Sequence, residues 1–185
     1  ETAGPLAGYQ DAVSFAAAPE GLSFGQYFTP ANETEFVLLS APTPGAANAA
    51  ARFGPAAINE IMYHPAAGYD EFIELSNPTA SPVKLYDPDH PAHTWELDGA
   101  VSYAFPEGME IPAGGYLLVT AADVTDPATE AAFRAGYNVP ADVPVLGPYS
   151  GKLTNAGGSV ELYAPGEPDV GGQFGRIPID HVSYD

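Results

Sequence analysis

The chain of 185 residues contains no cysteine. Disulfide bridges and thiolate chemistry are therefore excluded. A chain of this length can form one domain with a sizeable core, or one domain plus a fragment of another, so it does not need disulfides to fold. The lack of cysteine consequently leaves the compartment of the protein open.

Basic residues are scarce. Five Lys and Arg stand against 24 Asp and Glu, which gives a formal net charge of −19. Such a surface repels phosphate backbones, and the sequence has no basic stripe to overcome the repulsion, so we expect no binding of nucleic acid. Two interpretations of the acidity stay open: cation binding, and a surface that merely keeps a secreted protein soluble.

Long apolar runs are also missing. No run approaches the roughly 20 residues that a membrane-spanning helix needs, so we expect no membrane insertion. The stretch from Glu1 to Pro5 has neither the basic start nor the apolar core of a signal peptide. We therefore expect the chain to be cut from a larger protein.

No catalytic constellation stands out in the sequence. There is no cysteine to act as a nucleophile. Two neighbouring carboxylates could hydrolyse a glycoside, but no feature singles out one pair among the 24 acidic residues. We predict that the protein is not an enzyme and that it requires no cofactor.

Glycine and proline are abundant, with 20 of each, and alternating apolar residues lie between them. The clearest alternation is in residues 57–77. Ile58, Glu60 and Met62 fall on one face of a first strand, and a turn containing proline and glycine separates it from a second strand at 71–76. We predict that the two strands form an antiparallel pair around which the fold is built.

The remaining pattern predicts mostly strands and turns. We expect further strands at residues 11–15, 35–39, 83–86, 94–97, 101–105, 116–120, 143–149, 159–163 and 179–184. One short helix is expected over residues 127–135, because Asp126 and Pro127 suit the N-cap and the first helical position and Gly136 suits a stop. The expected interior includes Ile61, Phe72 or Ile73, Trp95, Phe105, Tyr116, Leu118 and Leu162.

An ordered series of motifs extends from residue 57 to residue 184. It comprises Ile58-Asn59-Glu60-Ile61, Glu71 to Pro78, Trp95, Tyr103 to Pro106, Ile111 to Val119, Leu153 to Leu162 and Ile179 to Tyr184. In this order and spacing the sequence resembles a lamin tail domain in its bacterial, secreted form. The resemblance implies an all-β fold over residues 57–185: an immunoglobulin-like β-sandwich of two antiparallel sheets, without catalytic residues.

Residues 1–48 are predicted to be an end segment docked on the main domain. They would be either the tail of a preceding copy or the missing end of this domain. Asp11 to Phe15 repeats the Asp, Val, Ser and aromatic spacing of Asp180 to Tyr184. The stretches Gly21 to Tyr27 and Thr43 to Asn48 are similar to those that commonly follow bacterial lamin tail domains. An alanine-rich linker, residues 46–57, would join the two parts.

Calcium is the first candidate ligand. Calcium takes six to eight oxygen ligands, and the region around Asn59 and Asn77 contains four carboxylates: Glu60, Asp70, Glu71 and Glu74. No Asp-x-Asp-x-Asp-Gly loop is present to fix such a site. The alternative, which we favour, is that these carboxylates are solvated or accept hydrogen bonds from backbone N–H groups in turns.

A second candidate metal site lies in the loop that contains Asp87, Asp89, His90 and His93. These residue types suit zinc or another transition metal. The loop is rich in proline and is not expected to be helical, so the His-x-x-His spacing fixes no geometry. We favour a solvated loop.

Aromatic residues near glycine and proline form the last candidate. These residues, which could form a glycan- or protein-binding face, are Tyr9, Tyr27, Phe28, Tyr69, Tyr137 and Tyr149. The alternative, which we favour, is that turn tyrosines cap the core.

The lamin-tail resemblance and the acidity indicate a non-catalytic interaction module of a larger secreted or surface-anchored bacterial protein, for adhesion, spacing or targeting. Its expected partners are other protein domains, surface glycans or neighbouring repeat modules, at an extracellular or cell-surface location. The alternative function is a calcium- or carbohydrate-binding module attached to an enzyme.

Overall fold

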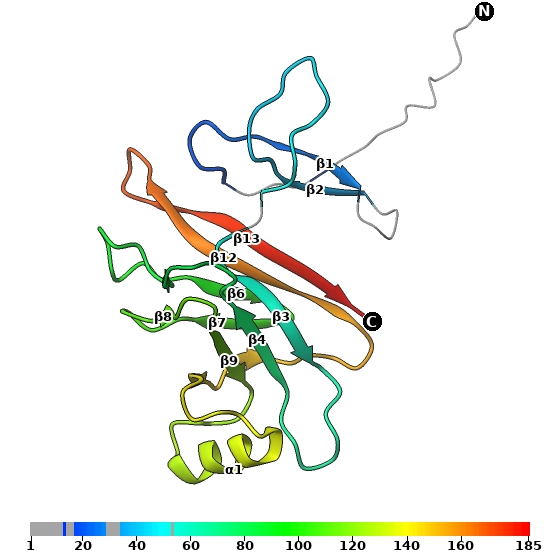
Figure 1. The fold of residues 1–185 in the computed structure, drawn as a ribbon, viewed down its shortest axis with the longest axis vertical. Helices are drawn as coiled ribbons and strands as arrows, with labels where there is room; N and C mark the ends of the chain where they lie inside the picture. The colour runs from blue at the N-terminus through cyan, green and yellow to red at the C-terminus, as the bar shows by residue number, and fades with distance from the viewer. Residues whose placement is uncertain (1–12, 14–16, 29–33, 53) are drawn as a thin grey trace, which may run out of the picture.

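The computed structural model describes residue 13 and residues 17–28, 34–52 and 54–185. The order of elements along the chain is shown in Figure 1. The elements are β1 (Phe24–Phe28), β2 (Thr34–Leu38), β3 (Ala57–Met62), β4 (Phe72–Ser76), β5 (Val83–Lys84), β6 (Glu96–Gly99), β7 (Val101–Ala104), β8 (Glu110–Ile111), β9 (Tyr116–Thr120), α1 (Pro127–Tyr137), β10 (Val145–Leu146), β11 (Ser150–Gly151), β12 (Gly158–Pro168) and β13 (Phe174–Tyr184).

Two sheets form the sandwich. One has the strand order β10-β9-β4-β3, the other has the order β11-β7-β6-β12-β13, and two short ribbons, β1-β2 and β5-β8, complete the described structure. The predicted all-β sandwich with one short helix is confirmed. The sheets are antiparallel except at one edge, where Val145 and Leu146 of β10 pair in parallel with β9.

The predicted pair at residues 57–77 is confirmed as the antiparallel strands β3 and β4. The predicted faces of the first strand are wrong beyond Ile58, because a bulge interrupts the register between Ile58 and Glu60. The extra residue turns the rest of β3 over. Ile58 and Ile61 consequently both pack on the core between the sheets, whereas Met62 packs on a cluster outside it.

A single apolar cluster fills the space between the sheets. Trp95 and Phe105 lie in it, as expected, but Phe72 and Leu118 belong to a second cluster, where they pack with Phe133 of α1. The reason is that both faces of the β4 and β9 strands are covered, one by the opposite sheet and the other by α1. The largest fully buried apolar side chains of the main cluster are Ile73, Leu75, Leu85, Leu97, Ile111, Leu117, Leu153 and Leu162.

Tyr116 is not an interior residue. Its side chain is 44% exposed, so the prediction that it lies in the core is wrong. Tyr116 is the first residue of β9 and pairs with Ser76, the last residue of β4, at the end of the ladder. The buried part of the strand begins one residue later, at Leu117.

Asn77 is buried at the end of β4, with 1% of its surface exposed. Its Nδ2 donates to the carbonyl oxygens of Ser81, Ile111 and Pro112 at 2.8, 3.0 and 2.9 Å. Its Oδ1 accepts from the backbone N–H and the hydroxyl of Thr79 at 2.9 and 2.7 Å. This side chain therefore ties the loop after β4 to the β8 strand, and its amide oxygen already has two donors.

The helix begins as predicted and ends later than predicted. Asp126 is the N-cap and accepts from the backbone N–H of Thr129, and Pro127 is the first helical residue. Gly136, expected as a stop, lies inside α1, because Asn138 instead adopts the left-handed conformation and caps the helix. In the part of the chain that the structure describes, no helix has the length and hydropathy needed to cross a membrane.

One predicted strand is shorter than expected, and another falls largely outside the described residues. The stretch 143–149 is reduced to the two residues of β10, because Pro144 and Pro148 flank it and neither can donate to a ladder. The strand expected at 11–15 lies outside the described residues except for Val13, which is 51% exposed.

Candidate functional site

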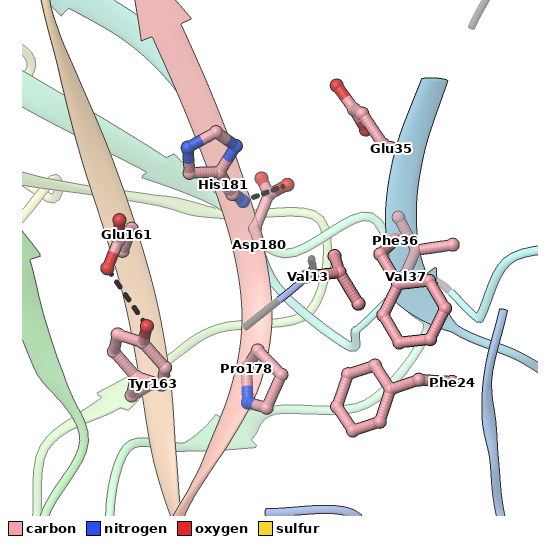
Figure 2. Close-up of a pocket in the computed structure, with 10 residues that line it drawn as sticks. All are labelled: Val13, Phe24, Glu35, Phe36, Val37, Glu161, Tyr163, Pro178, Asp180 and His181. Atoms are coloured by element: carbon pink, nitrogen blue, oxygen red, sulfur yellow. Dashed lines mark hydrogen bonds between the residues drawn. The ribbon is translucent and has the colours of Figure 1, made fainter. Parts of the chain in front are cut away.

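The β1-β2 ribbon lies beside the outer face of β12 and β13, above the sandwich in Figure 1. A cleft of about 320 Å³ separates it from these strands. Figure 2 shows ten lining residues, of which nine come from the ribbon, β12 and β13 and one, Val13, precedes the ribbon in the chain. They are Val13, Phe24, Glu35, Phe36, Val37, Glu161, Tyr163, Pro178, Asp180 and His181.

The ribbon is a regular antiparallel pair in which Gln26 lies opposite Phe36. The rings of Phe24 and Phe36 stack with their centroids 6.0 Å apart. A side chain at Gly25 would not fit, because its Cβ would lie 2.6 Å from Leu39 Cδ1. The segment after β2 therefore folds directly over the ribbon, on the side of Gly25.

The segment that follows the ribbon is ordered by its own contacts. Asn48 donates from Nδ2 to the Gln26 carbonyl at 3.0 Å, and the backbone N–H of Ala49 donates to the Thr43 hydroxyl at 3.3 Å. Leu39 and Ala51 form an isolated bridge. The stretch 46–57 is therefore not a plain linker, and its last part enters the main core with Ala56, which is 1% exposed.

A backbone hydrogen bond connects this amino-terminal part to the sandwich. The N–H of Ala17 donates to the Arg176 carbonyl on β13 at 3.2 Å. Further along, the N–H of Ile58 donates to Asp180 Oδ2 at 2.7 Å, which joins β3 to β13 at the edge of the sandwich. Asp180 is half-buried there, and this burial raises the pKa of its carboxyl above the usual value.

A charged and aromatic network lies on β12 and β13 beside the cleft. Arg176 forms ion pairs with Glu96 and with Asp98, the latter at 2.7 Å, and its guanidinium lies 4.0 Å from the centre of the Tyr163 ring. The hydrogen bond from Arg176 holds the pKa of the Asp98 carboxyl below its usual value. The Tyr163 hydroxyl donates to Glu161 at 2.9 Å. Tyr163 and Glu161 are thus held in place on the wall of the cleft.

The cleft is acidic. Its described lining residues include the carboxylates of Glu35, Glu161 and Asp180 and no Lys or Arg. A neighbouring hollow of about 160 Å³ shares Glu35 and Asp180 with it and adds Arg52. The arrangement combines apolar surface with a rim of negative charge, which suits a ligand that carries apolar groups and positive charge.

The four predicted calcium ligands face different surroundings. Glu60 and Glu74 are cross-strand partners on β3 and β4, and Asn59 donates to Glu74 Oε1 at 2.6 Å. Glu71 instead accepts from the Tyr149 hydroxyl and from the Leu153 N–H, both at 3.0 Å.

Asp70 is exposed in the β3–β4 loop. Within the described ranges, no three Asp, Glu or His side chains are grouped in a way that could hold a metal ion. Calcium binding through Glu60, Asp70, Glu71 and Glu74 stays a prediction.

The loop with two histidines is docked on β13. His90 Nδ1 lies 2.8 Å from Asp87 Oδ2, and the Asp89 N–H donates to the other oxygen of Asp87 at 2.9 Å. The His93 ring stacks on Phe174 with centroids 3.5 Å apart. The second candidate metal set is therefore engaged in loop contacts, and its rings pack on a strand rather than lying wholly in solvent.

The candidate aromatic residues are dispersed over the molecule. Tyr149 is buried, with 6% exposed, whereas Phe28 at the end of β1 is 66% exposed. Tyr69 and Tyr137 come together at the helix, with ring centroids 5.4 Å apart. Tyr9 lies outside the described residues.

The sequence did not indicate the cleft residues as a set. Glu35 on β2 is far along the chain from Glu161 and Asp180, which lie on the paired strands β12 and β13, and each has the pattern of an ordinary strand residue. The spacing that Asp11 to Phe15 shares with Asp180 to Tyr184 indicates β13, which borders the cleft. Four of the five residues from 11 to 15 lie outside the described residues.

Comparison with known families agrees with the architecture. The family profile described as Lamin Tail Domain matches residues 49–178. This segment extends from the residues before β3 into β13 and covers more than half of the chain. No curated protein matches the chain. The chain belongs to the lamin tail domain family, whose members are immunoglobulin-like β-sandwiches.

Proposed function

We propose that the chain is a non-catalytic interaction module of a larger secreted or surface-anchored bacterial protein, and that the cleft between the β1-β2 ribbon and β13 binds a segment of a partner protein. The observation that carries this proposal is the cleft itself, with its apolar surface and carboxylate rim. Adhesion, spacing or targeting of the parent protein would follow from such binding.

The negative charge of the cleft determines which partner segments it attracts. Glu35, Glu161 and Asp180 line the cleft, and the whole chain has a formal charge of −19. A segment with Lys or Arg beside apolar side chains is attracted to this surface, whereas an acidic segment is repelled. The apolar contact with Pro178 and Val37 then adds affinity in proportion to the area removed from water.

Shape also favours a protein segment. The cleft lies along β13 in Figure 2, and it shares lining residues with the neighbouring hollow. An elongated surface of this kind suits an extended chain with several side chains better than it suits one small molecule. Such a segment would come from a neighbouring module of the same parent protein or from a separate surface protein.

The test uses the full chain and a phage-displayed library of random peptides. Selected peptides should combine Lys or Arg with aliphatic or aromatic residues. A synthetic copy of the best peptide should bind several-fold more weakly to Glu35→Gln and to Glu161→Gln, about tenfold more weakly to the double variant, and more weakly at high salt.

Glu107→Gln is the matched control, because Glu107 is an exposed carboxylate outside the cleft. The control variant should bind the peptide as the unchanged chain does. Selection of peptides without basic residues, or equal affinity for the double variant and the control, would overturn the proposal.

A further inference from the structure

A second hollow lies at the other end of the molecule from the β1-β2 ribbon. There the loop between β3 and β4 meets α1 (Figure 1). The hollow has a volume of about 410 Å³, and Tyr69, Asp70, Thr129, Gly136 and Tyr137 are among the residues that line it. This volume falls in the range of sites for small molecules.

Tyr69 presents its ring at this hollow. The side chain is 46% exposed, and its ring packs edge-on against Tyr137 at an angle of 62°. A Cβ at position 136 would lie 2.9 Å from Tyr69 Cε1, so the Tyr69 ring lies directly on the backbone of α1 at Gly136. These contacts hold one exposed aromatic ring in a fixed orientation.

Tyr137 gives this arrangement a rigid base. Its ring centroid lies 4.9 Å from that of Phe72 and 5.1 Å from that of Phe133 in the second apolar cluster. Its hydroxyl donates to the backbone carbonyl of Asp70 at 2.8 Å. Loop and helix are thereby tied together before any ligand arrives, which lowers the entropy cost of binding.

Asp70 places a carboxylate next to the exposed ring. It is exposed, and within the described part of the chain its carboxylate has no ion pair or side-chain hydrogen bond, since the bond from Tyr137 goes to its backbone carbonyl. An ionised carboxylate only accepts hydrogen bonds, and its two oxygens can receive two neighbouring hydroxyl donors. A ring face and a pair of acceptors therefore border the same hollow.

We propose that this hollow binds a neutral sugar, with the C–H face of one pyranose ring stacked on Tyr69 and two adjacent hydroxyl groups donating to Asp70. A sugar ring is the class of ligand that offers an apolar face and neighbouring donors at once. Acidic sugars are excluded by the charge of −19 on the chain. The site is separate from the cleft, so this inference does not depend on the proposed function.

A peptide fits the same hollow less well. Strand addition needs a row of unpaired backbone groups, and here the Tyr69 N–H already donates to the Ala66 carbonyl at 3.0 Å. The Asp70 carbonyl is occupied by Tyr137. The Tyr69 ring and the Asp70 carboxylate remain available to a ligand.

The test is a titration of the isotope-labelled full chain, followed by amide NMR spectra. The probes are neutral cello-, xylo-, manno-, galacto- and chito-oligosaccharides at concentrations up to about 10 mM, where weak binding is still measurable. At least one sugar should shift the amide signals of residues 68–70 and 129–137 in a saturable manner.

Variants separate stacking from other effects. Tyr69→Ala should weaken binding at least about tenfold, and Tyr69→Phe should keep it within about threefold because the ring face remains. Asp70→Asn should weaken binding while leaving the melting temperature unchanged. Gly136→Ala should also weaken it, because its methyl group displaces the Tyr69 ring.

Tyr116→Ala is the matched control, since Tyr116 is exposed to a similar extent, 44%, at the start of β9. It should bind the sugar as the unchanged chain does. The inference is overturned if no sugar in the panel shifts these signals, if the shifts map to the cleft instead, or if Tyr69→Ala and Tyr116→Ala lose equal affinity. It is also overturned if the peptide selected for the cleft displaces the sugar from the hollow.

Discussion

The hydroxyl of Tyr149 donates to Glu71 Oε2 across 3.0 Å, although the two residues lie 78 positions apart in the chain. The Leu153 N–H donates to the same oxygen at 3.0 Å. Tyr149 is 6% exposed, and burial, followed by the charge of Glu71, raises the pKa of its hydroxyl. Tyr149 therefore remains a donor, and Glu71 connects the start of β4 with the segment around β11.

Tyr149→Phe should destabilise the protein by about 1–2 kcal/mol, because Glu71 loses one of its two donors. Glu71→Ala should cost about 2–4 kcal/mol, since it leaves two donors without their acceptor. Urea unfolding of both variants and of the double variant measures the coupling, which we expect to exceed about 0.5 kcal/mol. Strictly additive losses would show that the hydrogen bond contributes nothing to stability.

Asn77→Ala should cost about 2–4 kcal/mol of unfolding free energy, because three carbonyl groups lose their donor and the two groups of Thr79 lose their acceptor. Asn59→Ala is the control. Asn59 is exposed and makes one side-chain bond, to Glu74, so its removal should change stability by less than about 0.5 kcal/mol. Equal losses for the two variants, measured by urea unfolding, would contradict the role assigned to Asn77.

Asp180 makes stability depend on pH. Burial raises the pKa of its carboxyl in the folded protein, so between the unfolded and folded pKa values the folded state holds more protons than the unfolded state. The contribution of Asp180 to the free energy of unfolding therefore falls as pH rises from about 4 through the raised pKa. Asp180→Asn removes this dependence and keeps an oxygen that can accept from Ile58.

Melting temperatures from pH 4 upward, taken as differences between Asp180→Asn and the unchanged chain, test this assignment. The melting temperature of Asp180→Asn minus that of the unchanged chain should increase with pH until Asp180 is fully ionised. Above that pH the difference should stay constant. A difference that is constant over the whole range, or that shrinks with rising pH, would contradict it.

Calcium binding through Glu60, Asp70, Glu71 and Glu74 is tested by thermal unfolding. If calcium binds through these carboxylates, it stabilises the folded state by mass action, so millimolar calcium raises the melting temperature relative to a chelator, and Glu60→Gln removes the rise. Identical curves with calcium and with chelator would show that these carboxylates are solvated or hydrogen-bonded. We favour this outcome, because Glu71 and Glu74 already accept hydrogen bonds within the protein.

The amino-terminal part should stabilise the sandwich. A chain that begins at Gly54 loses the backbone bond between Ala17 and Arg176 and the apolar cover that the ribbon provides over β13. We expect its melting temperature to fall by about 4 °C or more. A soluble monomer that melts within a degree or two of the full chain would show that residues 1–53 are dispensable.

The alternation around residues 57–77 was sufficient to predict the β3 and β4 strands, and Asp126 with Pro127 marked the start of α1. The sequence alone did not predict the bulge after Ile58, because a bulge is a property of two paired strands. It also did not predict that Gly136 lies within the helix. Glycine suits a helix end, and only the contact with Tyr69, which comes from a distant loop, explains its position.

The candidate sites were predicted less well for a related reason. Glu71 and Glu74 are close in sequence, yet one faces Tyr149 and the other Asn59. Conversely, Glu35 and Asp180 line one cleft from opposite ends of the chain. A site of this kind depends on how the ribbon lies on the sandwich, and local patterns contain no information about that packing.

The most direct test of the binding cleft is amide hydrogen exchange of the full chain with and without the selected basic peptide. We predict slower exchange in β2 (Thr34–Leu38) and in the Arg176–Val182 part of β13, because these segments border the cleft. Exchange in α1 and in residues 68–70 should be unchanged. Protection confined to α1 and that loop, or absent from β2 and β13, would contradict the account.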